Sequence, residues 1–253
     1  MADEILTERR GRTLVITINR PEARNAFNLP VAQGLAAAMD ELDDSPELSV
    51  AILTGAGGNF SAGMDLKAFA SGELPYVEGR GIGFTERPPR KPVIAAVEGY
   101  ALAGGTEMVL ATDLIVASRT AKFGIPEVKR GLVAAGGALL RLPRRIPYHL
   151  AMELALTGEP IGAERAAQIG IVSRLTEPGE AVAGARELAA AIARNGPLAI
   201  DASKRVVAAA ADWPAAEAWE RQAEITGPVF ASEDAREGAT AFAEKRDPVW
   251  RGR

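Results

Sequence analysis

The 253-residue chain contains no cysteine and a single histidine, His149. The lack of cysteine excludes disulfides, thiolate nucleophiles and cysteine-based zinc sites. One histidine cannot form a multi-histidine metal site, and a serine–histidine–aspartate triad would depend on that residue alone, so we expect no metal site. His149 follows Pro147 and Tyr148 at the start of a helical pattern, which favours a surface or capping role. Acid–base chemistry is therefore expected from carboxylates, lysine or tyrosine.

The chain also has no excess of positive charge and no long apolar run. Its formal net charge is −4 and its pI is about 5.3, which gives no indication of binding to nucleic acid or to an anionic membrane. No apolar run reaches the ~20 residues of a membrane span. The acidic start, residues 1–4, lacks the apolar segment of a secretion signal. We expect a cytoplasmic protein with neither nucleic-acid nor membrane partners.

What is present is an ordinary globular composition, with 47% hydrophobic and 25% charged residues. Apolar, β-branched runs predict strands at residues 13–19, 50–54, 93–97, 114–117 and 121–124. Helices are predicted from the N-cap Asn28 to about Leu42, and then at 147–156, 163–168, 181–194, 198–211, 215–226 and 233–245. Strands and helices alternate over the first ~145 residues, which predicts an α/β core followed by a helical C-terminal appendage.

Two further segments are rich in glycine. Residues 71–90 combine glycine, proline and charge, which indicates a mobile loop or a weakly patterned helix, and long connections of this kind often act as lids. Residues 55–58 (GAGG) follow a predicted strand, but Ser61 replaces the third glycine of a dinucleotide-binding fingerprint. We therefore expect no nucleotide-cofactor site there.

The most informative stretch is Val93–Asp113 (VIAAVEGYALAGGTEMVLATD). It predicts a buried strand, a turn of small residues and a helix with Glu107 in its first turn. A glycine pair at a helix N-terminus offers unpaired N–H groups and the positive end of the helix dipole. Such a site can bind an anion or stabilise an oxygen that becomes one, and Glu107 is a candidate proton carrier beside it.

Several segments resemble the motifs of the crotonase superfamily (enoyl-CoA hydratase/isomerase), and they occur in the family's order. They are Asn19-Arg20-Pro21 with Arg24-Asn25-Ala26, Phe60–Leu66 (FSAGMDL), Gly99–Glu107 (GYALAGGTE), Phe123–Glu127 (FGIPE) and Phe242–Pro248 (FAEKRDP). The resemblance runs from about Thr13 to the end of the chain and is specific, because the motifs agree jointly.

The resemblance implies an α/β fold, a crotonase-like spiral of ββα units in place of a doubly wound sheet. It divides the chain into a core at residues 1–195, with the acyl-CoA site, and a C-terminal helical region at 196–253. That region takes part in trimerisation, so a homotrimer or a dimer of trimers is expected. The substrate would be an acyl-CoA, and no separate cofactor is expected because coenzyme A is part of that substrate.

The resemblance also implies roles for individual residues. The backbone N–H groups of Met64 and Gly104 match the family's oxyanion hole, which would bind the thioester carbonyl oxygen. Glu107 and Glu127 match the two acid–base glutamates of the hydratases. Many family members keep only one of these glutamates, so the presence of both favours enoyl-CoA hydratase activity.

Coenzyme A would lie across the first loop and the Phe60–Leu66 turn. Arg24 is a candidate for contact with its phosphates, and Lys67 is a second cation nearby. The remaining candidates for substrate contact are Ala26, Ala62, Asp65, Leu66 and Gly105. Lys245 is expected to approach the nucleotide bound by a neighbouring subunit.

The chain departs from the family pattern in two places near the acyl site. Ala103 replaces the first glycine of the usual triple, and residues 131–137 lack the proline common after the second glutamate. In addition, the ending Phe242–Arg253 resembles that of carnitinyl-CoA dehydratases. The alternatives are therefore a carnitinyl-CoA dehydratase or another crotonase-type isomerase or dehydratase, and then a non-catalytic CoA-binding protein, which the two glutamates argue against.

Overall fold

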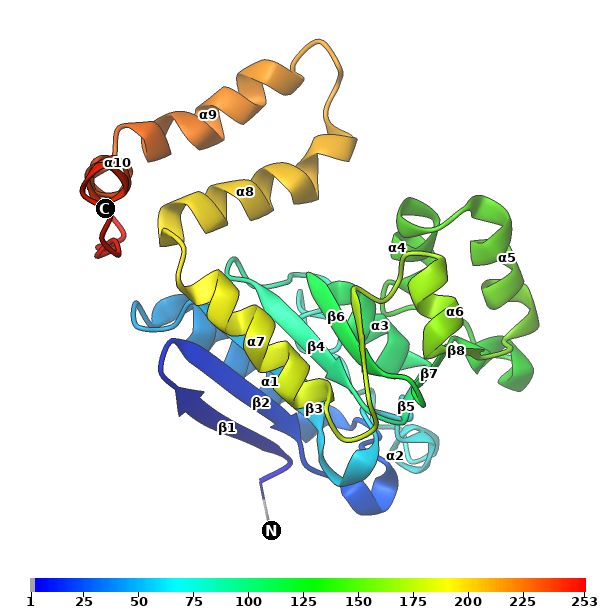
Figure 1. Ribbon diagram of the computed structural model, residues 1–253. Helices are drawn as coiled ribbons and strands as arrows, with labels where there is room; N and C mark the ends of the chain where they lie inside the picture. Colours follow the sequence, from blue (N-terminus) through cyan, green and yellow to red (C-terminus); the bar gives the residue numbers. More distant parts are fainter. Residues whose placement is uncertain (1–2) are drawn as a thin grey trace.

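A computed structural model describes residues 3–253 of the chain (Figure 1). Met1 and Ala2, which belong to the acidic start, lie outside the described residues. The strands are β1 (Ile5–Arg10), β2 (Thr13–Ile18), β3 (Val50–Gly55), β4 (Val93–Val97), β5 (Tyr100–Leu102), β6 (Leu114–Ser118), β7 (Lys122–Gly124), β8 (Ile161–Gly162) and β9 (Arg174–Thr176). The α-helices are α1 (Leu29–Asp44), α2 (Leu66–Ala70), α3 (Gly104–Ala111), α4 (Ala138–Arg145), α5 (Tyr148–Thr157), α6 (Ala163–Gln168), α7 (Ala181–Ala193), α8 (Pro197–Ala209), α9 (Ala218–Phe230) and α10 (Glu233–Glu244). Short 3-10 turns are η1 (Pro21–Ala23), η2 (Ala56–Gly58), η3 (Pro126–Arg130) and η4 (Ala210–Asp212).

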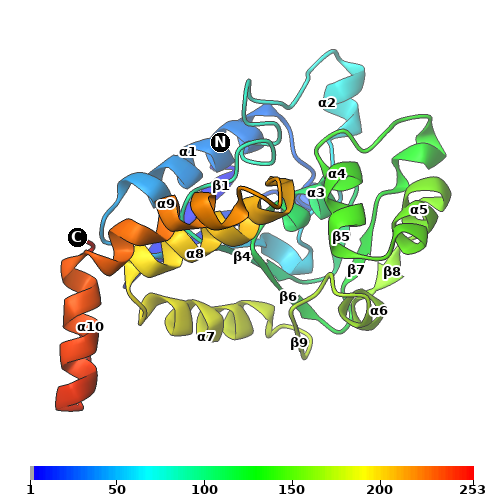
Figure 2. The same ribbon diagram turned by 90° about the horizontal axis from the view of Figure 1, so that it is seen from above.

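A six-stranded sheet in the order β1-β2-β3-β4-β6-β9 forms the centre of the molecule. Only the β1–β2 pair is antiparallel, and the other neighbours run parallel. Helix α7 covers one face and α1 and α3 lie on the other (Figures 1 and 2). Within β3, Leu53 belongs to the apolar cluster on one face and Ile52 to the cluster under α7. Burial on both faces explains why these strands are almost continuously apolar.

A second, three-stranded sheet in the order β5-β7-β8 carries the segments that lead to the candidate site. β5 and β7 pair in parallel, with Ala101 opposite Phe123. The buried Thr106 Oγ1 lies 2.6 Å from the Ala101 carbonyl oxygen and 2.9 Å from the Gly124 carbonyl oxygen, which share its single hydroxyl hydrogen. It also accepts from the Gly124 N–H at 3.0 Å. Thr106 therefore fixes the start of α3 to both strands.

Most predicted elements are present, and Asn28 caps α1 as expected, accepting from the Val31 N–H at 3.1 Å. The expectation that the chain beyond residue 145 is entirely helical is wrong, because β8 and β9 lie there. β1 and α4 were also not anticipated. β1 is mostly exposed and polar at the sheet edge, and α4 contains Pro143, a residue that normally argues against a helix interior.

The connection at residues 71–90 contains no helix, so it is a loop as one of the two interpretations states. Its second half is held against the core by Ile82 and Phe84, whose side chains are fully buried. The part around Leu74 and Tyr76 is more exposed. The first half of the connection is therefore less packed than the second, although Pro75 is buried.

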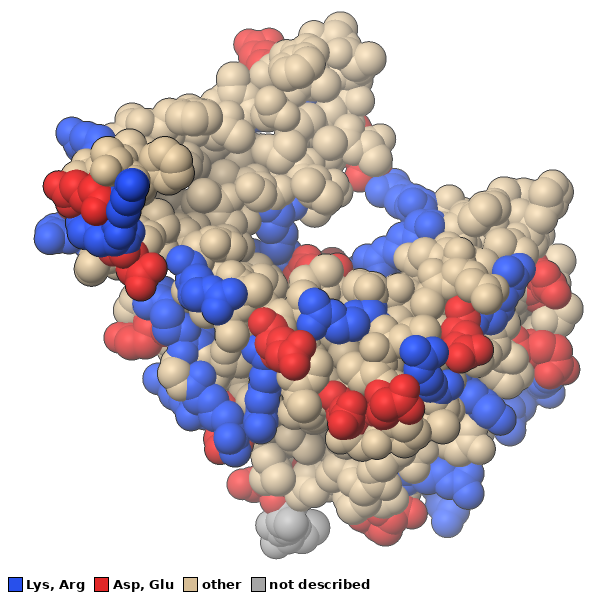
Figure 3. Space-filling model, viewed as in Figure 1, with Lys and Arg blue, Asp and Glu red and all other residues tan. Residues whose placement is uncertain are grey.

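Helices α8, α9 and α10 extend beyond the two sheets (Figure 1). They bury few side chains and expose large apolar ones, including Val207, Trp219, Phe230 and Phe242. α8 begins at Pro197, next to the boundary at residues 195/196, but the division into two regions stays a prediction. Within residues 3–253, no helix combines the length and apolar character needed to cross a bilayer. Figure 3 shows basic and acidic side chains interspersed on one face of the molecule, without a dominant basic patch there.

Candidate functional site

The candidate site is a cavity of about 410 Å³ beside the small sheet. Its residues come from the loop before α1, the turn before α2, α2 itself, the connection at residues 71–90, the β5–α3 junction with the start of α3, η3 and the loop after η3. Seven predicted site residues line it: Arg24, Ala62, Met64, Leu66, Gly104, Glu107 and Glu127. The other lining residues are Phe27, Phe69, Tyr76, Leu102, Ala103, Pro126, Arg130, Leu132 and Val133. The lining is therefore mostly apolar, with two carboxyl groups inside it.

The parallel pairing of β5 with β7 brings Glu107 and Glu127 together. β5 leads into α3, which carries Glu107, and β7 leads into η3, which carries Glu127. Parallel neighbours end at the same edge of a sheet, so both carboxyl groups emerge at one edge. The Ala103 N–H donates to the Gly124 carbonyl at 2.8 Å and joins the two strand ends directly.

Glu107 is almost fully buried, with 2% of the residue exposed. The backbone N–H of Ala138, at the start of α4, donates to its Oε1 at 3.2 Å. Burial raises the pKa of the Glu107 carboxyl, and the amides of Ala138, Gly136 and Gly137 act in the opposite direction. Gly136 leaves room for this contact, since a Cβ there would lie 2.6 Å from Glu107 Oε2. These donors offset part of the effect of burial, and the pKa of Glu107 stays above its ordinary value.

Glu127 occupies a different environment at the other side of the cavity. Its Oε2 is buried and has no hydrogen-bond partner among residues 3–253. Burial, with a smaller contribution from the charge of Glu107, raises the pKa of Glu127 to about 7, against the effect of its own backbone N–H. At neutral pH this carboxyl is therefore partly protonated, which suits a group that donates a proton.

Met64 lies in a short parallel bridge with Phe27. The Phe27 N–H donates to the Gly63 carbonyl at 2.9 Å, and the Asp65 N–H donates to the Phe27 carbonyl at 2.9 Å. The bridge thus uses the residues on either side of Met64. Because backbone groups alternate in direction along an extended segment, the Met64 N–H points away from Phe27 and is left for another acceptor.

Gly104 begins α3, so its N–H has no acceptor within the helix. A Cβ on Gly63 would lie 3.4 Å from the Gly104 nitrogen, which places the segment that contains Met64 directly beside this N–H. A Cβ on Gly104 would lie 2.4 Å from Phe27 Cε1. Only glycine therefore fits at the start of α3 while Phe27 packs against it.

Four of the predicted substrate-contact residues do not line the cavity. Ala26 precedes Phe27, and Asp65 caps α2 by accepting from the N–H groups of Lys67 and Ala68. Lys67 is exposed at the start of α2. A Cβ on Gly105 would lie 2.4 Å from a backbone oxygen, that of Ser61, so Gly105 allows α3 to approach the neighbouring turn. Their contacts with coenzyme A stay predictions, as does that of Lys245, which is exposed at the end of α10.

Sequence reasoning missed several lining residues, of which Tyr76 is the most notable. Burial, and after it the charges of Glu107, Glu127 and Glu86, raise the pKa of Tyr76. The tyrosine comes from the connection at residues 71–90, whose composition carries no periodic signal. Its place in a long connection between strands is the one feature that could have indicated it.

His149 is exposed on α5, and its ring lies edge-on to that of Tyr148 with 5.6 Å between the centroids. It does not line the cavity, so the expected surface position is confirmed. Within the part of the chain that the structure describes, no group of three or more histidine, cysteine, aspartate or glutamate side chains could hold a metal ion.

Residues 8–253 match the family model described as enoyl-CoA hydratase/isomerase. The crystal structure of an enoyl-CoA hydratase from Mycobacterium tuberculosis H37Rv is 62% identical, with a TM-score of 0.98 over 99% of this chain and 100% of that chain. Enoyl-CoA hydratase EchA19 of M. tuberculosis is 45% identical over 99% of this chain and 97% of its own length. A carnitinyl-CoA hydratase from Mycobacterium avium is 44% identical, with a TM-score of 0.80 and full coverage of both chains. These likenesses confirm the crotonase-like fold, and the chain belongs to the enoyl-CoA hydratase/isomerase family of the crotonase superfamily.

Proposed function

We propose that the protein is an enoyl-CoA hydratase, which adds water reversibly to the 2,3 double bond of a 2-enoyl-CoA thioester. The observation that carries this proposal is the presence of Glu107 and Glu127 in one cavity, next to the N–H groups of Met64 and Gly104. Hydration needs one group that takes a proton from water and another that gives a proton to Cα. Two carboxyl groups in different environments meet that need.

The two backbone N–H groups bind the thioester carbonyl oxygen. Attack of the water oxygen on Cβ moves electrons through Cα to this oxygen, which becomes an enolate. Donors that are already in place stabilise the enolate more than the ground-state carbonyl, which lowers the barrier. In comparable sites, the loss of one such donor costs roughly 3–4 kcal/mol.

The hydrogen-bond partners of the carboxyl groups support a division of roles. The amides at the start of α4 donate to Glu107 and offset part of the rise in its pKa, so we assign Glu107 as the group that takes a proton from the attacking water. Glu127, whose pKa is about 7, donates its proton to Cα. Proton exchange from Glu107 to Glu127 through water then restores the starting state.

The cavity lining supports an apolar acyl group. Leu102, Leu132 and Val133 are apolar, and apart from Glu107 and Glu127 the lining carries no carboxyl group. The charged side chains that remain are those of Arg24 and Arg130, so beyond the two proposed catalytic groups the lining offers no carboxylate to pair with the trimethylammonium group of a carnitinyl thioester. We therefore favour an uncharged 2-enoyl chain.

The runner-up is carnitinyl-CoA dehydration, which the names of several relatives favour. The C-terminal motif that resembles those enzymes lies at the end of α10 and in the following tail. None of residues 242–253 lines the cavity. The motif is thus separate from the residues that would contact the acyl group.

We also propose self-association into a homotrimer or a dimer of trimers. The exposed apolar side chains of α8–α10, such as Trp219 and Phe230, support this assembly because burial of such side chains is favourable. Sedimentation equilibrium would measure it, and a monomer at micromolar concentration would contradict it. A cytoplasmic location and the absence of a separate cofactor stay predictions.

The hydratase assignment is tested with crotonyl-CoA. We expect Glu107→Gln and Glu127→Gln each to lower kcat at least ~100-fold, because each removes one proton-transfer group while keeping the size of the side chain. Glu153→Gln, on the exposed face of α5, is the matched control and keeps the wild-type rate. Wild-type rates in both cavity variants would contradict the assigned roles.

A panel of thioesters then separates the remaining activities. Crotonyl-CoA, its γ-trimethylammonium analogue and a 3-enoyl-CoA would be incubated with the enzyme, and the products read by mass spectrometry. Hydration of crotonyl-CoA is expected to dominate. Preference for the trimethylammonium analogue would show the dehydratase, and a product isomerised from the 3-enoyl-CoA would show an isomerase. Thermal stabilisation by coenzyme A without turnover would show a non-catalytic binding protein.

A further inference from the structure

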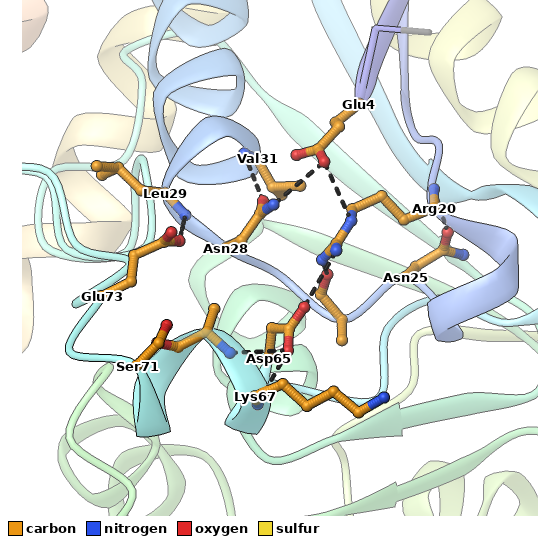
Figure 4. A network of polar contacts seen from close by, with 12 residues as sticks. Glu4, Arg20, Asn25, Asn28, Leu29, Val31, Asp65, Lys67, Ser71 and Glu73 are labelled. Carbon is orange, nitrogen blue, oxygen red and sulfur yellow. Dashed lines mark hydrogen bonds and ion pairs between the residues drawn. The ribbon is translucent and has the colours of Figure 1, made fainter. Parts of the chain in front are cut away.

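Arg20 lies at the centre of a polar network next to the candidate site (Figure 4). Only 15% of its side chain is exposed. Its guanidinium donates from Nη1 to the Ala26 carbonyl and from Nη2 to Asp65 Oδ2 at 3.1 Å. Its Nε lies 3.2 Å from Glu4 Oε1. Arg20 therefore joins three segments that are far apart in the sequence.

Two of these segments are the strands of the bridge that orients Met64. Ala26 directly precedes Phe27, and Asp65 directly follows Met64. The guanidinium thus connects the two strands of the bridge: Nη1 contacts the strand with Ala26, and Nη2 contacts the strand with Asp65. Charge-assisted hydrogen bonds from one planar group fix the distance between their acceptors more tightly than two independent contacts would.

The two partner carboxylates extend the network to the starts of two helices. Asp65 Oδ1 accepts from the N–H groups of Lys67 at 3.1 Å and Ala68 at 3.3 Å, which caps α2. Glu4 Oε1 accepts from Asn28 Nδ2 at 3.1 Å, and Asn28 caps α1. Arg20 therefore connects the helix that precedes the site in the sequence with the one that follows the Met64 turn.

We propose that Arg20 is a positioning residue for the reaction: by holding Ala26 and Asp65 at a fixed separation, it keeps the Met64 N–H aimed at the thioester oxygen. This inference rests on the proposed function, because it assigns Arg20 to the oxyanion hole of the hydratase. Arg20 does not line the cavity, so it acts through Met64 and touches no substrate.

The test uses Arg20→Gln and Arg20→Lys in the full-length protein. Displacement of one donor by about 1 Å is expected to reduce kcat roughly 10- to 100-fold, because the enolate depends on its position, while KM changes less than ~3-fold. Lysine offers one ammonium group in place of the planar guanidinium with its several donors, so Arg20→Lys is expected to recover only part of kcat. Arg9→Gln is the control, since Arg9 also joins a strand to α1 through Glu41, at 53% exposure and away from the cavity.

A spectroscopic measurement follows the donor directly. Butyryl-CoA, labelled with carbon-13 at the thioester carbonyl, cannot be hydrated, and its C=O stretching frequency falls when the oxygen accepts hydrogen bonds. We expect Arg20→Gln to lose at least about half of the wild-type frequency shift, and Arg9→Gln to keep all of it. A purely structural role would lower thermal stability and leave both the bound frequency and kcat unchanged.

Asp65→Asn provides a second variant if Arg20→Gln does not fold. Asparagine remains a good N-cap for α2 but loses the ionic contact with Arg20, so the same loss of kcat and of frequency shift is expected. A folded Arg20→Gln or Asp65→Asn with wild-type kcat and frequency overturns the positioning role alone. If the wild-type protein shows the frequency shift but does not turn over crotonyl-CoA, the hydratase proposal is overturned. The role of Arg20 is then tested by the infrared measurement alone. No shift in the wild type overturns the oxyanion hole and with it the role of Arg20.

Discussion

Each side of the cavity carries one glutamate, but the surroundings of the two glutamates differ. On the inner wall, which is α3 with the start of α4, Glu107 is 2% exposed and held by backbone amides. On the outer wall, which is residues 126–133, Val128 and Val133 are 41% and 62% exposed, and Glu127 Oε2 has no partner within residues 3–253. Burial raises the pKa of both carboxyl groups, but backbone amides offset it at Glu107, whereas Glu127 Oε2 has no such donor among the described residues. In the proposed mechanism, environment and not residue type therefore divides the acid–base roles.

The largest expected effect comes from a methyl group on the inner wall. In Gly136→Ala, the new Cβ would lie 2.6 Å from Glu107 Oε2 and 2.8 Å from Ile82 Cδ1. We expect the carboxylate to turn away from its amides and kcat for crotonyl-CoA to fall roughly 100-fold.

The matched change on the outer wall is Gly131→Ala. A Cβ at Gly131 meets nothing within 4 Å, although its φ of +68° makes alanine unfavourable by about 1 kcal/mol. Activity within about threefold of wild type is expected, with a lower melting temperature. Equal activity losses in the two variants would remove the distinction between the walls.

The second effect is the pH dependence of the rate. Glu127 must be protonated to donate to Cα, and its pKa is about 7. We expect kcat/KM for hydration to fall tenfold per pH unit above that value. His149→Gln, at an exposed position outside the cavity, serves as the control and should keep the same pH dependence. If the same fall in rate with pH persists in the residual activity of Glu127→Gln, the titrating group is not Glu127.

The third effect is on stability. The folded-state pKa of Glu127 is raised from 4.5 to about 7, so its contribution to stability is fully present below pH 4.5 and is lost as pH rises through about 7. A shift of this size sets an upper bound of about 3 kcal/mol, which solvent screening of the partly exposed carboxyl reduces. Chemical denaturation at several pH values should therefore show Glu127→Gln gaining on the wild type across this window. A difference independent of pH would contradict the raised pKa.

The smallest expected effect is at Ala103, which adopts φ 52° and ψ −128° immediately before α3. Such a conformation costs a residue with a Cβ of order 1–3 kcal/mol, and glycine relieves it at the expense of chain entropy. Ala103→Gly is expected to raise the melting temperature by roughly 2–4 °C, with a change in kcat of less than about threefold. An unchanged or lower melting temperature would show that the surrounding contacts already compensate.

The sequence predicts the parts of this molecule that depend on local pattern. β3, β4 and α1 with its Asn28 cap follow from β-branched runs and a capping residue. β1 and α4 were not predicted, because a polar edge strand and a helix with an internal Pro143 contradict those patterns. Tyr76 could not be placed, since only tertiary packing brings its loop to the cavity.

The candidate site divides in the same way. Residue patterns indicated an anion-binding helix start and Glu107 beside it, whereas the pairing with Glu127 and Met64 came from the family resemblance. Their proximity depends on β5–β7 pairing and on the Phe27–Met64 bridge, both of which join distant parts of the chain. No local rule gives such contacts.

The β5–β7 pair sets the spacing of the two proton-transfer groups in the proposed reaction. Glu107 lies in the first turn of α3 after β5, and Glu127 lies in η3 after β7, so the pairing of these two strands sets the interval between the proposed proton acceptor and proton donor. Point substitutions in the lining leave that interval intact, which makes the acyl pocket free to diversify. Insertion or deletion of one residue between Gly124 and Glu127 would instead change the interval between the two carboxyl groups, and no side-chain substitution could restore it.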